Sequence, residues 1–375
     1  MKYNLSDICE YVKDKVNVAI LDEETYISTE NMMPNKGGIT SASSLPTIAQ
    51  TQAFFVGDVL VSNIRPYFKK IWFAEFDGGC SNDVLVFRAR GGVSKRFLYY
   101  VLADDIFFNY SMATSKGTKM PRGDKAAIMR YEVPKLTYQE QEKIAGILEV
   151  LDRKIQLNAE INDNLQQQLH MFYTKMFAES AMDAVLGDVV VTASGGTPSR
   201  KHSEYYNHGN ICWVKSKELF GDYLHDTEEY INELAIAKSS AKLLPSHSVL
   251  IAMYGATVGA YGIISHPMTC NQAVCALLST EKYPYTYLFQ IACESQQKLI
   301  NLAVGSAQQN ISQVLIKQLP IHSNEDIIQE FHSLARPIHE KLETLQAENR
   351  QLSEMRDSLL PKLMSGELDV SSIDL

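Results

Sequence analysis

The chain has 375 residues, of which 45% are hydrophobic and 21% are charged, and its formal net charge at pH 7 is -9. This length predicts two or three domains with ordinary hydrophobic cores, and the composition excludes a largely disordered chain. The acidic total argues against a protein that coats nucleic acid through general positive charge. A role in nucleic-acid binding therefore requires basic residues that gather locally.

Compartment is indicated by the first residues and by the cysteines. Residues 1–10 contain Asp7 and Glu10 and no apolar run, so no secretory signal is expected. The six cysteines form no Cys-x-x-Cys pair, which argues against a disulfide framework and against a zinc site. Residues 243–280 lack charge but contain prolines, glycines and histidines, so a membrane span is rejected. We expect a cytoplasmic protein.

Residues 1–138 are predicted to form a first strand-rich domain. Short runs of branched residues at 59–62 and 83–87 predict strands, and residues 97–110 predict a helix. Two loops are basic: residues 62–70 carry three positive charges and two aromatic rings, and residues 116–125 carry four positive charges. Such loops suit DNA, because basic and amide side chains supply donors for phosphates and base edges. The candidate DNA-binding residues here are Asn63, Arg65, Tyr67, Lys69, Lys70, Lys116, Lys119 and Arg122.

Residues 139–179 are predicted to form a long spacer helix. From Ile144 to Met176, apolar residues and asparagines recur at alternate steps of four and three, with charged residues between them, which indicates a coiled-coil seam. A helix of about 35 residues is about 50 Å long, which is too long to be hidden inside an ordinary domain. The candidate helix-pairing residues are Leu148, Leu151, Ile155, Asn162 and Leu165.

Residues 183–322 are predicted to form a second domain that repeats the first. Residues 248–251 and 270–274 resemble residues 58–61 and 80–84 at an offset of 190 residues. A strand is predicted at 249–252 and a helix at 285–302. The candidate DNA-binding residues here are Thr197, Ser199, Arg200, Lys201, Lys215, Ser216, Lys217, Tyr254, Thr257, Gln308, Gln309 and Asn310.

Residues 323–364 are predicted to form a second spacer helix, followed by a tail at 365–375. The seam of the first helix returns 187 residues later, with Asn349 at the position of Asn162. Antiparallel pairing would place the two domains at opposite ends of the helices, related by a pseudo-two-fold axis, and a buried asparagine would set the register. The alternative is that each helix packs only on its own domain. The candidate pairing residues are Ile338, Leu342, Leu345, Asn349 and Leu352.

Motifs for catalysis are missing from the sequence. It contains no phosphate-binding Gly-x-x-x-x-Gly-Lys loop, no dinucleotide-binding Gly-x-Gly-x-x-Gly motif, no Asn-Pro-Pro-aromatic motif and no metal-binding cluster. The nine histidines are dispersed and are interpreted as ordinary surface or core residues. No catalytic and no metal-binding residue is therefore predicted, and the chain is interpreted as a non-enzyme.

The order domain, helix, domain, helix resembles the specificity subunit of type I restriction-modification systems over nearly the whole chain. The motifs that carry this resemblance are Ser194-Gly-Gly-Thr-Pro-Ser-Arg200, Trp213-Val-Lys-Ser216, residues 254–259, Asn271-Gln-Ala-Val274 and the tail at 363–370. The resemblance implies an α+β chain in which two target-recognition domains, separated by two antiparallel helices, each read one half of a bipartite double-stranded DNA site. It implies a role in DNA methylation and phage defence.

The same resemblance implies the partners. Two methyltransferase subunits would dock on the helices, and a nuclease and translocase subunit is an optional further partner. This chain would bind no cofactor; S-adenosylmethionine, ATP and magnesium would belong to the partners. Two rival interpretations stay open: a specificity chain of a related system whose partner fuses methyltransferase and nuclease, and a coiled-coil scaffold that binds proteins. Salt-dependent DNA binding would separate the scaffold from the others.

The two domains differ in one respect that bears on recognition. The Gly-Gly-Thr-Pro loop has no equivalent after residues 5–8, where Lys13-Asp-Lys-Val16 stands instead. The two halves should therefore read different DNA sequences. The resemblance supports base contacts only for residues 197–201, whereas Arg65, Lys69, Lys119 and Arg122 are inferred from charge and position. The target bases and the spacer length cannot be read from the sequence.

Overall fold

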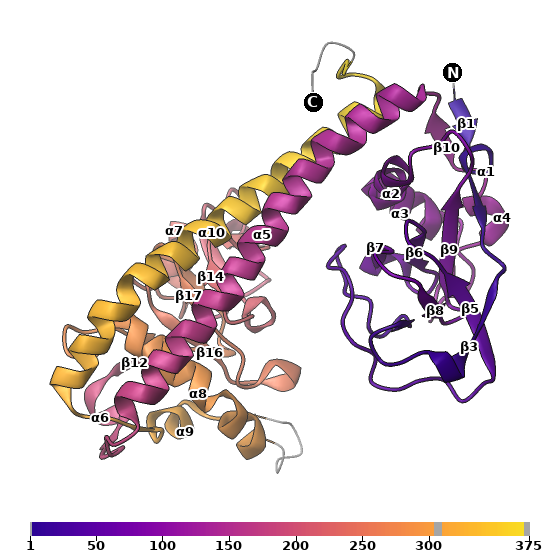
Figure 1. Ribbon diagram of the computed structural model, residues 1–375. Coiled ribbons are helices and arrows are strands. Elements are labelled where there is room, and N and C mark those ends of the chain that lie inside the picture. Colours follow the sequence, from indigo (N-terminus) through magenta and orange to yellow (C-terminus); the bar gives the residue numbers. More distant parts are fainter. Residues whose placement is uncertain (1, 304–309, 371–375) are drawn as a thin grey trace. The chain divides into compact units, whose positions relative to one another are not determined.

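The structure is a computed structural model that describes residues 2–303 and 310–370 (Figure 1). Gln308 and Gln309, two predicted contact residues, lie outside the described residues. The chain divides into two compact units. The first holds the chain up to Lys154 together with the chain from Gln351 onward, and the second holds Ile155–Arg350. Each unit takes part of both long helices, α5 (Tyr138–Phe177) and α10 (Glu325–Ser365).

The first unit contains two four-stranded sheets. One is antiparallel, in the order β2 (Cys9–Tyr11), β9 (Val84–Ala89), β6 (Val59–Ser62), β7 (Ile71–Phe73). The other has the order β3 (Lys15–Asn17), β5 (Gln50–Phe54), β8 (Gly78–Cys80), β4 (Tyr26–Ile27), with β4 parallel to β8. A short ladder joins β1 (Lys2–Asn4) to β10 (Glu132–Pro134). The predicted strands at 59–62 and 83–87 are confirmed as β6 and β9.

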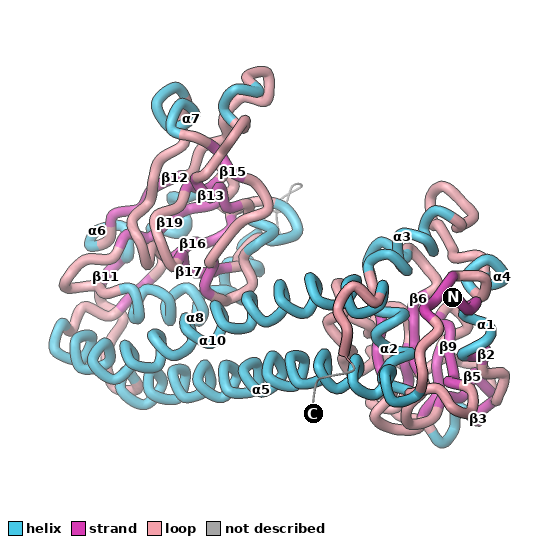
Figure 2. Tube along the Cα trace, turned by 90° about the horizontal axis from the view of Figure 1, so that it is seen from above, coloured by secondary structure: helices cyan, strands magenta, loops and turns pink. Residues whose placement is uncertain are grey.

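The central strands of this unit are buried on both faces. Val59 and Val61 face one core together with Phe97 of α2 (Lys95–Ala103), and Leu60 faces a second core together with Phe54. A strand buried on both faces is continuously apolar rather than alternating, as residues 59–61 are. Figure 2 shows α2 and α3 (Asp105–Ala113) beside β6 and β9. The remaining short helices are α1 (Leu5–Ile8), η1 (Val18–Ile20), η2 (Pro66–Phe68) and α4 (Lys125–Ile128).

The prediction of one helix over residues 97–110 is wrong. The segment breaks at Asp104, whose backbone is extended (φ -64°, ψ 136°) and whose carboxylate accepts a hydrogen bond from the Ile106 N–H at 2.9 Å. An aspartate is a favourable N-cap, because its carboxylate satisfies a donor that the first turn of a helix leaves free. The chain therefore ends α2 and begins α3 at this residue.

The second unit contains a mixed five-stranded sheet, in the order β12 (Val191–Ser194), β19 (Val274–Leu278), β16 (Val249–Ala252), β17 (Tyr261–Ile264), β14 (Tyr223–Leu224). A second sheet has the order β15 (Tyr230–Ile231), β13 (Ile211–Val214), β18 (Thr269–Cys270), and a short ladder joins β11 (Ala184–Val185) to β20 (Pro320–Ile321). The predicted strand at 249–252 is β16, and the predicted helix at 285–302 is α8 (Tyr285–Ala303). The other helices are α6 (Leu186–Val189), η3 (Ser203–Tyr205), η4 (Ser216–Glu218), α7 (Glu233–Lys238), η5 (Gly255–Thr257) and α9 (Gln313–Lys317).

The predicted internal repeat is confirmed at the level of strand register. The order β2, β9, β6, β7 in the first unit recurs as β12, β19, β16, β17 in the second. The pair Val59 and Phe87 recurs as Val249 and Leu277, so both partners are displaced by the same offset. The second sheets differ, because β5 pairs with β8 in the first unit whereas β18 pairs only with β13 among the described strands. The halves share one sheet and diverge in the other.

Within each unit, α5 and α10 run antiparallel (Figure 1). In the first unit Asp152 pairs with Arg356 at 2.8 Å, and earlier residues of α5 share a core with later residues of α10. In the second unit Asn158 lies beside Asn349, and the Phe177 ring lies 5.9 Å from that of Phe331. Rising residue numbers in α5 thus meet falling numbers in α10. The predicted antiparallel pairing is confirmed.

The seam residues also pack on their own domains. Leu148 of α5 joins the core of the first domain, and Leu342 of α10 joins the core of the second. The two interpretations of the heptads, helix pairing and domain packing, therefore both hold. The predicted pairing residues are buried or half-buried: Leu148, Leu151, Ile155, Asn162, Leu165, Ile338, Leu342, Leu345, Asn349 and Leu352.

Two polar residues of α5, rather than one, are buried in the seam. Asn158 is fully buried and donates to the Glu348 carboxylate at 2.8 Å and to Asn349 Oδ1 at 2.9 Å, and Asn349 donates in turn to the Ile155 carbonyl at 3.2 Å. Asn162 is buried one turn later. Buried amides stabilise less than leucines would, but they satisfy one another in only one register.

Candidate nucleic-acid interface

The two basic loops predicted in the first domain meet at the end of β6. The Arg65 N–H donates to the Pro121 carbonyl at 2.8 Å, and the Gly123 N–H donates to the Asn63 carbonyl at 3.2 Å. Ile64 and Arg122 form an isolated bridge between the loops. Residues 62–70 and 116–124, which are distant in sequence, therefore form one surface, called here the first basic surface.

Most basic side chains of the first basic surface are paired with acids of the same unit. Lys69 Nζ lies 2.6 Å from Asp105 Oδ2, Lys116 Nζ lies 2.5 Å from Asp124 Oδ2, and Arg122 Nη2 lies 3.2 Å from Asp83 Oδ1. Burial lowers the pKa of Lys70, whose ammonium donates to the Thr29 carbonyl at 2.7 Å. These pairs explain how local basic loops coexist with an acidic chain.

The other predicted residues of this surface differ in exposure. Tyr67 is 49% exposed and packs on Phe68 with ring centroids 4.6 Å apart, and Lys119 is fully open to solvent. Asn63 is only 8% exposed, so it supports the turn from beneath. Arg65 is half-buried. Tyr67, Lys119 and Arg65 are thus the members best placed to reach a ligand.

Sequence reasoning missed a polar pocket beside the first basic surface. Its volume is about 430 Å³, and it includes Asp83, the partner of Arg122, and Thr29, the partner of Lys70. Hydroxyl and amide groups dominate the remainder of its wall: Tyr26, Ser28, Asn31, Thr40, Ser41, Ser43, Ser44 and Ser81. The signal in the sequence was the hydroxyl-rich run at 40–44, which a search for positive charge passes over. Such groups are able to hydrogen-bond either base edges or phosphates.

In the second domain the Gly-Gly-Thr-Pro loop is held against the sheet by its backbone. The Gly195 N–H donates to the Val274 carbonyl at 3.1 Å, and the Gly196 N–H donates to the Cys270 carbonyl at 2.9 Å. The Trp213 indole donates to the Gly196 carbonyl at 2.9 Å. A Cβ at Gly196 would lie 2.3 Å from the Ser240 carbonyl carbon, so only glycine fits there.

This loop presents Arg200 to a cluster of charges and aromatic rings, called here the second basic surface. The Arg200 guanidinium lies 4.2 Å from the Tyr206 ring centroid and pairs with Glu229. Lys215 Nζ lies 2.5 Å from Glu229 Oε1, and Lys217 Nζ lies 2.5 Å from Glu228 Oε2. The adjacent lysines, Lys217 for Glu228 and Lys215 for Glu229, hold the pKa values of both carboxyls below their usual range. Three cations thus share two carboxylates.

The remaining predicted residues of the second domain lie close to this cluster or on the next turn. Thr197 is exposed, and its hydroxyl accepts from the Gln272 N–H at 3.4 Å; Ser199 and Lys201 are exposed and Ser216 is half-buried. Tyr254, 42% exposed, bridges Asn310 across the turn that contains the half-buried Thr257. The Met253 N–H donates to the Ala273 carbonyl at 2.8 Å, so residues 271–273 lie between the loop and the turn. The structure therefore brings both predicted groups onto one side of the sheet.

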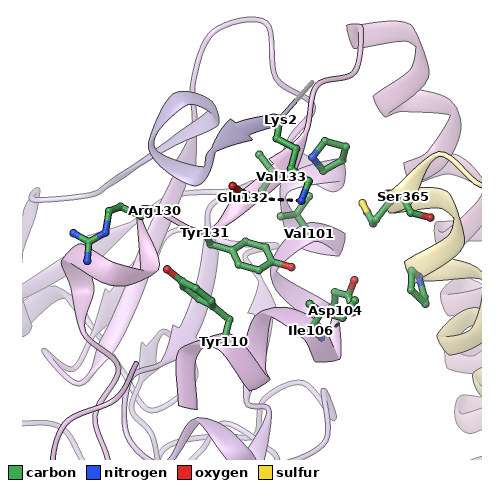
Figure 3. A pocket seen from close by; sticks show the side chains of 13 residues that line it. Lys2, Val101, Asp104, Ile106, Tyr110, Arg130, Tyr131, Glu132, Val133 and Ser365 are labelled. Carbon is green, nitrogen blue, oxygen red and sulfur yellow. Dashed lines mark hydrogen bonds and ion pairs between the residues drawn. The ribbon is translucent and has the colours of Figure 1, made fainter. Parts of the chain in front are cut away.

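A second kind of site, a pocket of about 730 Å³ in the first unit, carries no predicted residue (Figure 3). Tyr110 and Tyr131 line it, together with the buried Asp104 and with Glu132, which pairs with Lys2 at 2.8 Å. Burial raises the pKa of Asp104. Its mixed charges neutralise one another, so it does not form an anion site like the basic surfaces.

Metal and membrane sites were sought among the described residues. In residues 2–303 and 310–370, no three histidine, cysteine or acidic side chains gather in a way that would hold a metal ion. Over the same residues, each helix is too short or too polar to cross a lipid bilayer. The features that point to a ligand are therefore the two basic surfaces and the polar pocket beside the first.

Comparison with known proteins agrees with this geometry. The family model described as the type I restriction modification DNA specificity domain matches residues 1–167 and 181–323. The MjaIX specificity subunit of Methanocaldococcus jannaschii is 23% identical, over 76% of this chain and 71% of that protein. The HindI specificity subunit of Haemophilus influenzae is 22% identical, over 98% of this chain and 99% of that protein.

A solved structure shows the same fold. The type I restriction-modification S subunit from M. genitalium matches 97% of this chain and 96% of its own, with a TM-score of 0.57 at 16% identity. The family model covers the two repeated segments on which the basic surfaces lie, so the twofold occurrence of the recognition module is common to sequence and structure. The chain belongs to the family of type I restriction-modification DNA specificity proteins.

Proposed function

We propose that this chain is the non-catalytic DNA-recognition subunit of a type I restriction-modification complex, in which each domain reads one half of a bipartite double-stranded DNA site. One observation carries the proposal: the same strand order, β9-β6-β7 and β19-β16-β17, presents a basic surface in each unit. The two surfaces are built from different residues. A repeated scaffold with divergent polar loops suits a protein that reads two unlike sequences.

The state of the charges supports weak binding by the chain alone. Lys69, Lys116 and Arg122 contact carboxylates in the first unit, as do Arg200, Lys215 and Lys217 in the second. DNA phosphates must compete with these carboxylates, so little net positive charge is available for counterion release. Tight binding would then require partner subunits that add phosphate contacts around the duplex.

Apolar side chains on the long helices support docking of such partners. In the first unit, Val150 of α5 and Met355 of α10 are 64% and 51% exposed. In the second unit, Met171 of α5 and Leu334 of α10 are 63% and 45% exposed. Exposed apolar residues on otherwise charged helices are typical of binding surfaces. The partners we propose are two methyltransferase subunits that bind S-adenosylmethionine, with a nuclease and translocase that uses ATP and magnesium as a further subunit.

The decisive experiment is selection of DNA from a randomised duplex library by the purified complex of this chain with its methyltransferase subunits. We expect two separate conserved blocks with unread bases between them, and methylated adenines in those blocks when the genome of a host that expresses the complex is mapped. A labelled duplex that carries the selected site should bind the chain alone more weakly, and binding should fall steeply with salt. A chain that recovers no DNA motif in complex would be a protein scaffold instead.

A further inference from the structure

The turn after β6 and the turn after β16 are the same structure. In the first unit the Asn63 N–H donates to the Asp83 carbonyl at 2.8 Å, and in the second the Met253 N–H donates to the Ala273 carbonyl at 2.8 Å. Next along the chain, Ile64 bridges Arg122, as Tyr254 bridges Asn310. A 3-10 turn follows in both, η2 and η5. Each residue of one turn therefore has a structural counterpart 190 positions later.

The two turns differ at their left-handed positions. The second has glycine at both, Gly255 (φ 71°) and Gly259 (φ 82°), whereas the first has Arg65 (φ 51°) and Lys69 (φ 51°). A left-handed backbone is unfavourable for a residue with a Cβ, and it is more so at Arg65, because Pro66 follows and disfavours helical backbone before it. Such strain persists where the side chain serves a purpose that glycine cannot.

Lys69 has an evident structural purpose and Arg65 has none. The Lys69 ammonium lies 2.6 Å from Asp105, which also pairs with Lys36, so it ties the turn to α3. Arg65 Nε is shielded from solvent without an acceptor, and no described atom accepts a hydrogen bond from its guanidinium. No carboxylate of the described residues lies within ion-pair distance of it. The base of this side chain is thus packed in place while its donors are unused.

The residue beneath Arg65 points to the same conclusion. Asn63 is only 8% exposed, and its Oδ1 is buried without a hydrogen-bond partner. A Cβ at Gly123 would lie 2.8 Å from that oxygen, so the neighbouring loop presses closely on the amide. The counterparts of these two residues are Met253, which is apolar, and Gly255, at which an added Cβ would meet nothing within 4 Å. The polar pair occurs in one turn only, and the equivalent space in the other is empty.

We propose that Arg65 is a specificity-determining residue of the first domain, which reads a guanine of one half-site through the major groove, and that Asn63 positions it. The planar fork of arginine donors matches the O6 and N7 acceptors of guanine, and this pairing discriminates against the other bases. The second domain reads nothing through the equivalent position, because Gly255 has no side chain. This inference rests on the proposed DNA-recognition function and names the base class that one residue selects.

The test is to compare Arg65→Gly with the native chain, each in complex with its methyltransferase subunits, by selection from a randomised duplex library and by thermal unfolding. Glycine relieves the left-handed strain, so the unfolding midpoint should rise. Guanine preference at one position of the first half-site should fall about 10- to 100-fold, while the second half-site stays the same. Stability and specificity should thus change in opposite directions, which loss of folding cannot imitate.

Two further variants separate charge and strain from readout. Arg65→Lys keeps the charge and the strained backbone but removes the fork, so it should lose guanine preference without a gain in stability. Asn35→Gly, at another left-handed residue (φ 55°), should change stability alone.

Each outcome of the selection has one meaning. A native complex that selects a bipartite site, with an Arg65→Gly complex that selects the same site, would overturn the role of Arg65 and leave the proposed function standing. Equal weakening on every sequence would also overturn it, because that result marks a phosphate contact. A native complex that selects no site would overturn the proposed function, and this inference with it.

Discussion

The two domains carry the same sheet but arrange their positive charge differently. In the first, each cation of the basic surface has its own carboxylate, as Lys69 has Asp105 and Arg122 has Asp83. In the second, Arg200 and Lys215 share Glu229, and Arg200 also stacks on Tyr206. The scaffold is therefore constant and the polar chemistry at the strand ends is free to vary. The comparison also teaches that local basic loops do not require a basic protein when acids of the same unit neutralise them.

The sharpest way to break the comparison is to alter the glycine loop that only the second domain has. Gly196→Ala should destabilise the second unit by about 3 kcal/mol, because its Cβ would overlap the backbone at Ser240 and Ala241. Hydrogen exchange resolved by peptide should show the loss in residues 155–350 alone. Gly255→Ala is the matched control, since its Cβ meets no atom within 4 Å and only its backbone conformation is unfavourable, which costs about 1 kcal/mol. Equal losses in the two variants would contradict this account of the loop.

The next effect concerns readout by the second basic surface. Arg200→Ala should weaken binding to the selected site by roughly 1 to 3 kcal/mol and relax base preference in the second half-site only, because its guanidinium is held in orientation by Tyr206 and Glu229. Binding of the complex to single-base variants of the selected duplex measures this. A loss that is uniform over all variants would mark a phosphate contact, and no loss would return Arg200 to a role in the ion pairs alone.

The two units should also respond differently to mild acid, because all nine histidines lie between residues 155 and 350. Burial lowers the pKa of His339 to about 3, with His247 and His332 nearby acting in the same direction and the Tyr223 hydroxyl 2.9 Å from Nδ1. In the unfolded chain a histidine titrates near 6.5, so below that pH the unfolded state binds a proton that the native state refuses. Native stability is therefore complete above about pH 6.5 and is lost as the pH falls from there toward 3.

We expect the second unit to lose about 1.4 kcal/mol for each pH unit below about 6.5 from this residue, while the first unit keeps its stability down to the range where carboxylates titrate. Hydrogen exchange at pH 7 and pH 5.5 compares the units within one sample. His339→Gln, which is able to keep a hydrogen bond to Tyr223, should remove much of the difference. Parallel loss of protection in both units would show that the histidine cluster is not responsible.

The smallest expected effect tests the acids that hold the cations. Glu229→Gln frees Arg200 and Lys215 from one carboxylate, so general affinity for DNA should rise a few-fold and binding should depend more steeply on salt. Asp83→Asn should do the same for Arg122 in the first domain. Titration of a non-specific duplex at several salt concentrations measures both. A fall in affinity on either substitution would mean that the acid orients its cation for DNA rather than competing with DNA for it.

Prediction from sequence succeeded where the signal was local or repeated. The steps of four and three between seam residues are a property of one helix, and helices α5 and α10 appear where that spacing predicts them. The offset of 190 residues between matching segments reappears as matching strand register, from Val59 and Phe87 to Val249 and Leu277. The break at Asp104 was missed, because capping by one aspartate interrupts an apolar pattern that otherwise continues.

By itself the sequence determined the two domains, the two long helices and the loops that carry basic residues, since each rests on spacing along the chain. Only the tertiary structure decided which charges are free to bind DNA. Lys69 meets Asp105 across 36 residues and Arg200 meets Glu229 across 29, and no local pattern marks such partners. It also showed that Arg65 occupies a strained turn whose counterpart has glycine, because a backbone angle depends on what the fold packs around it.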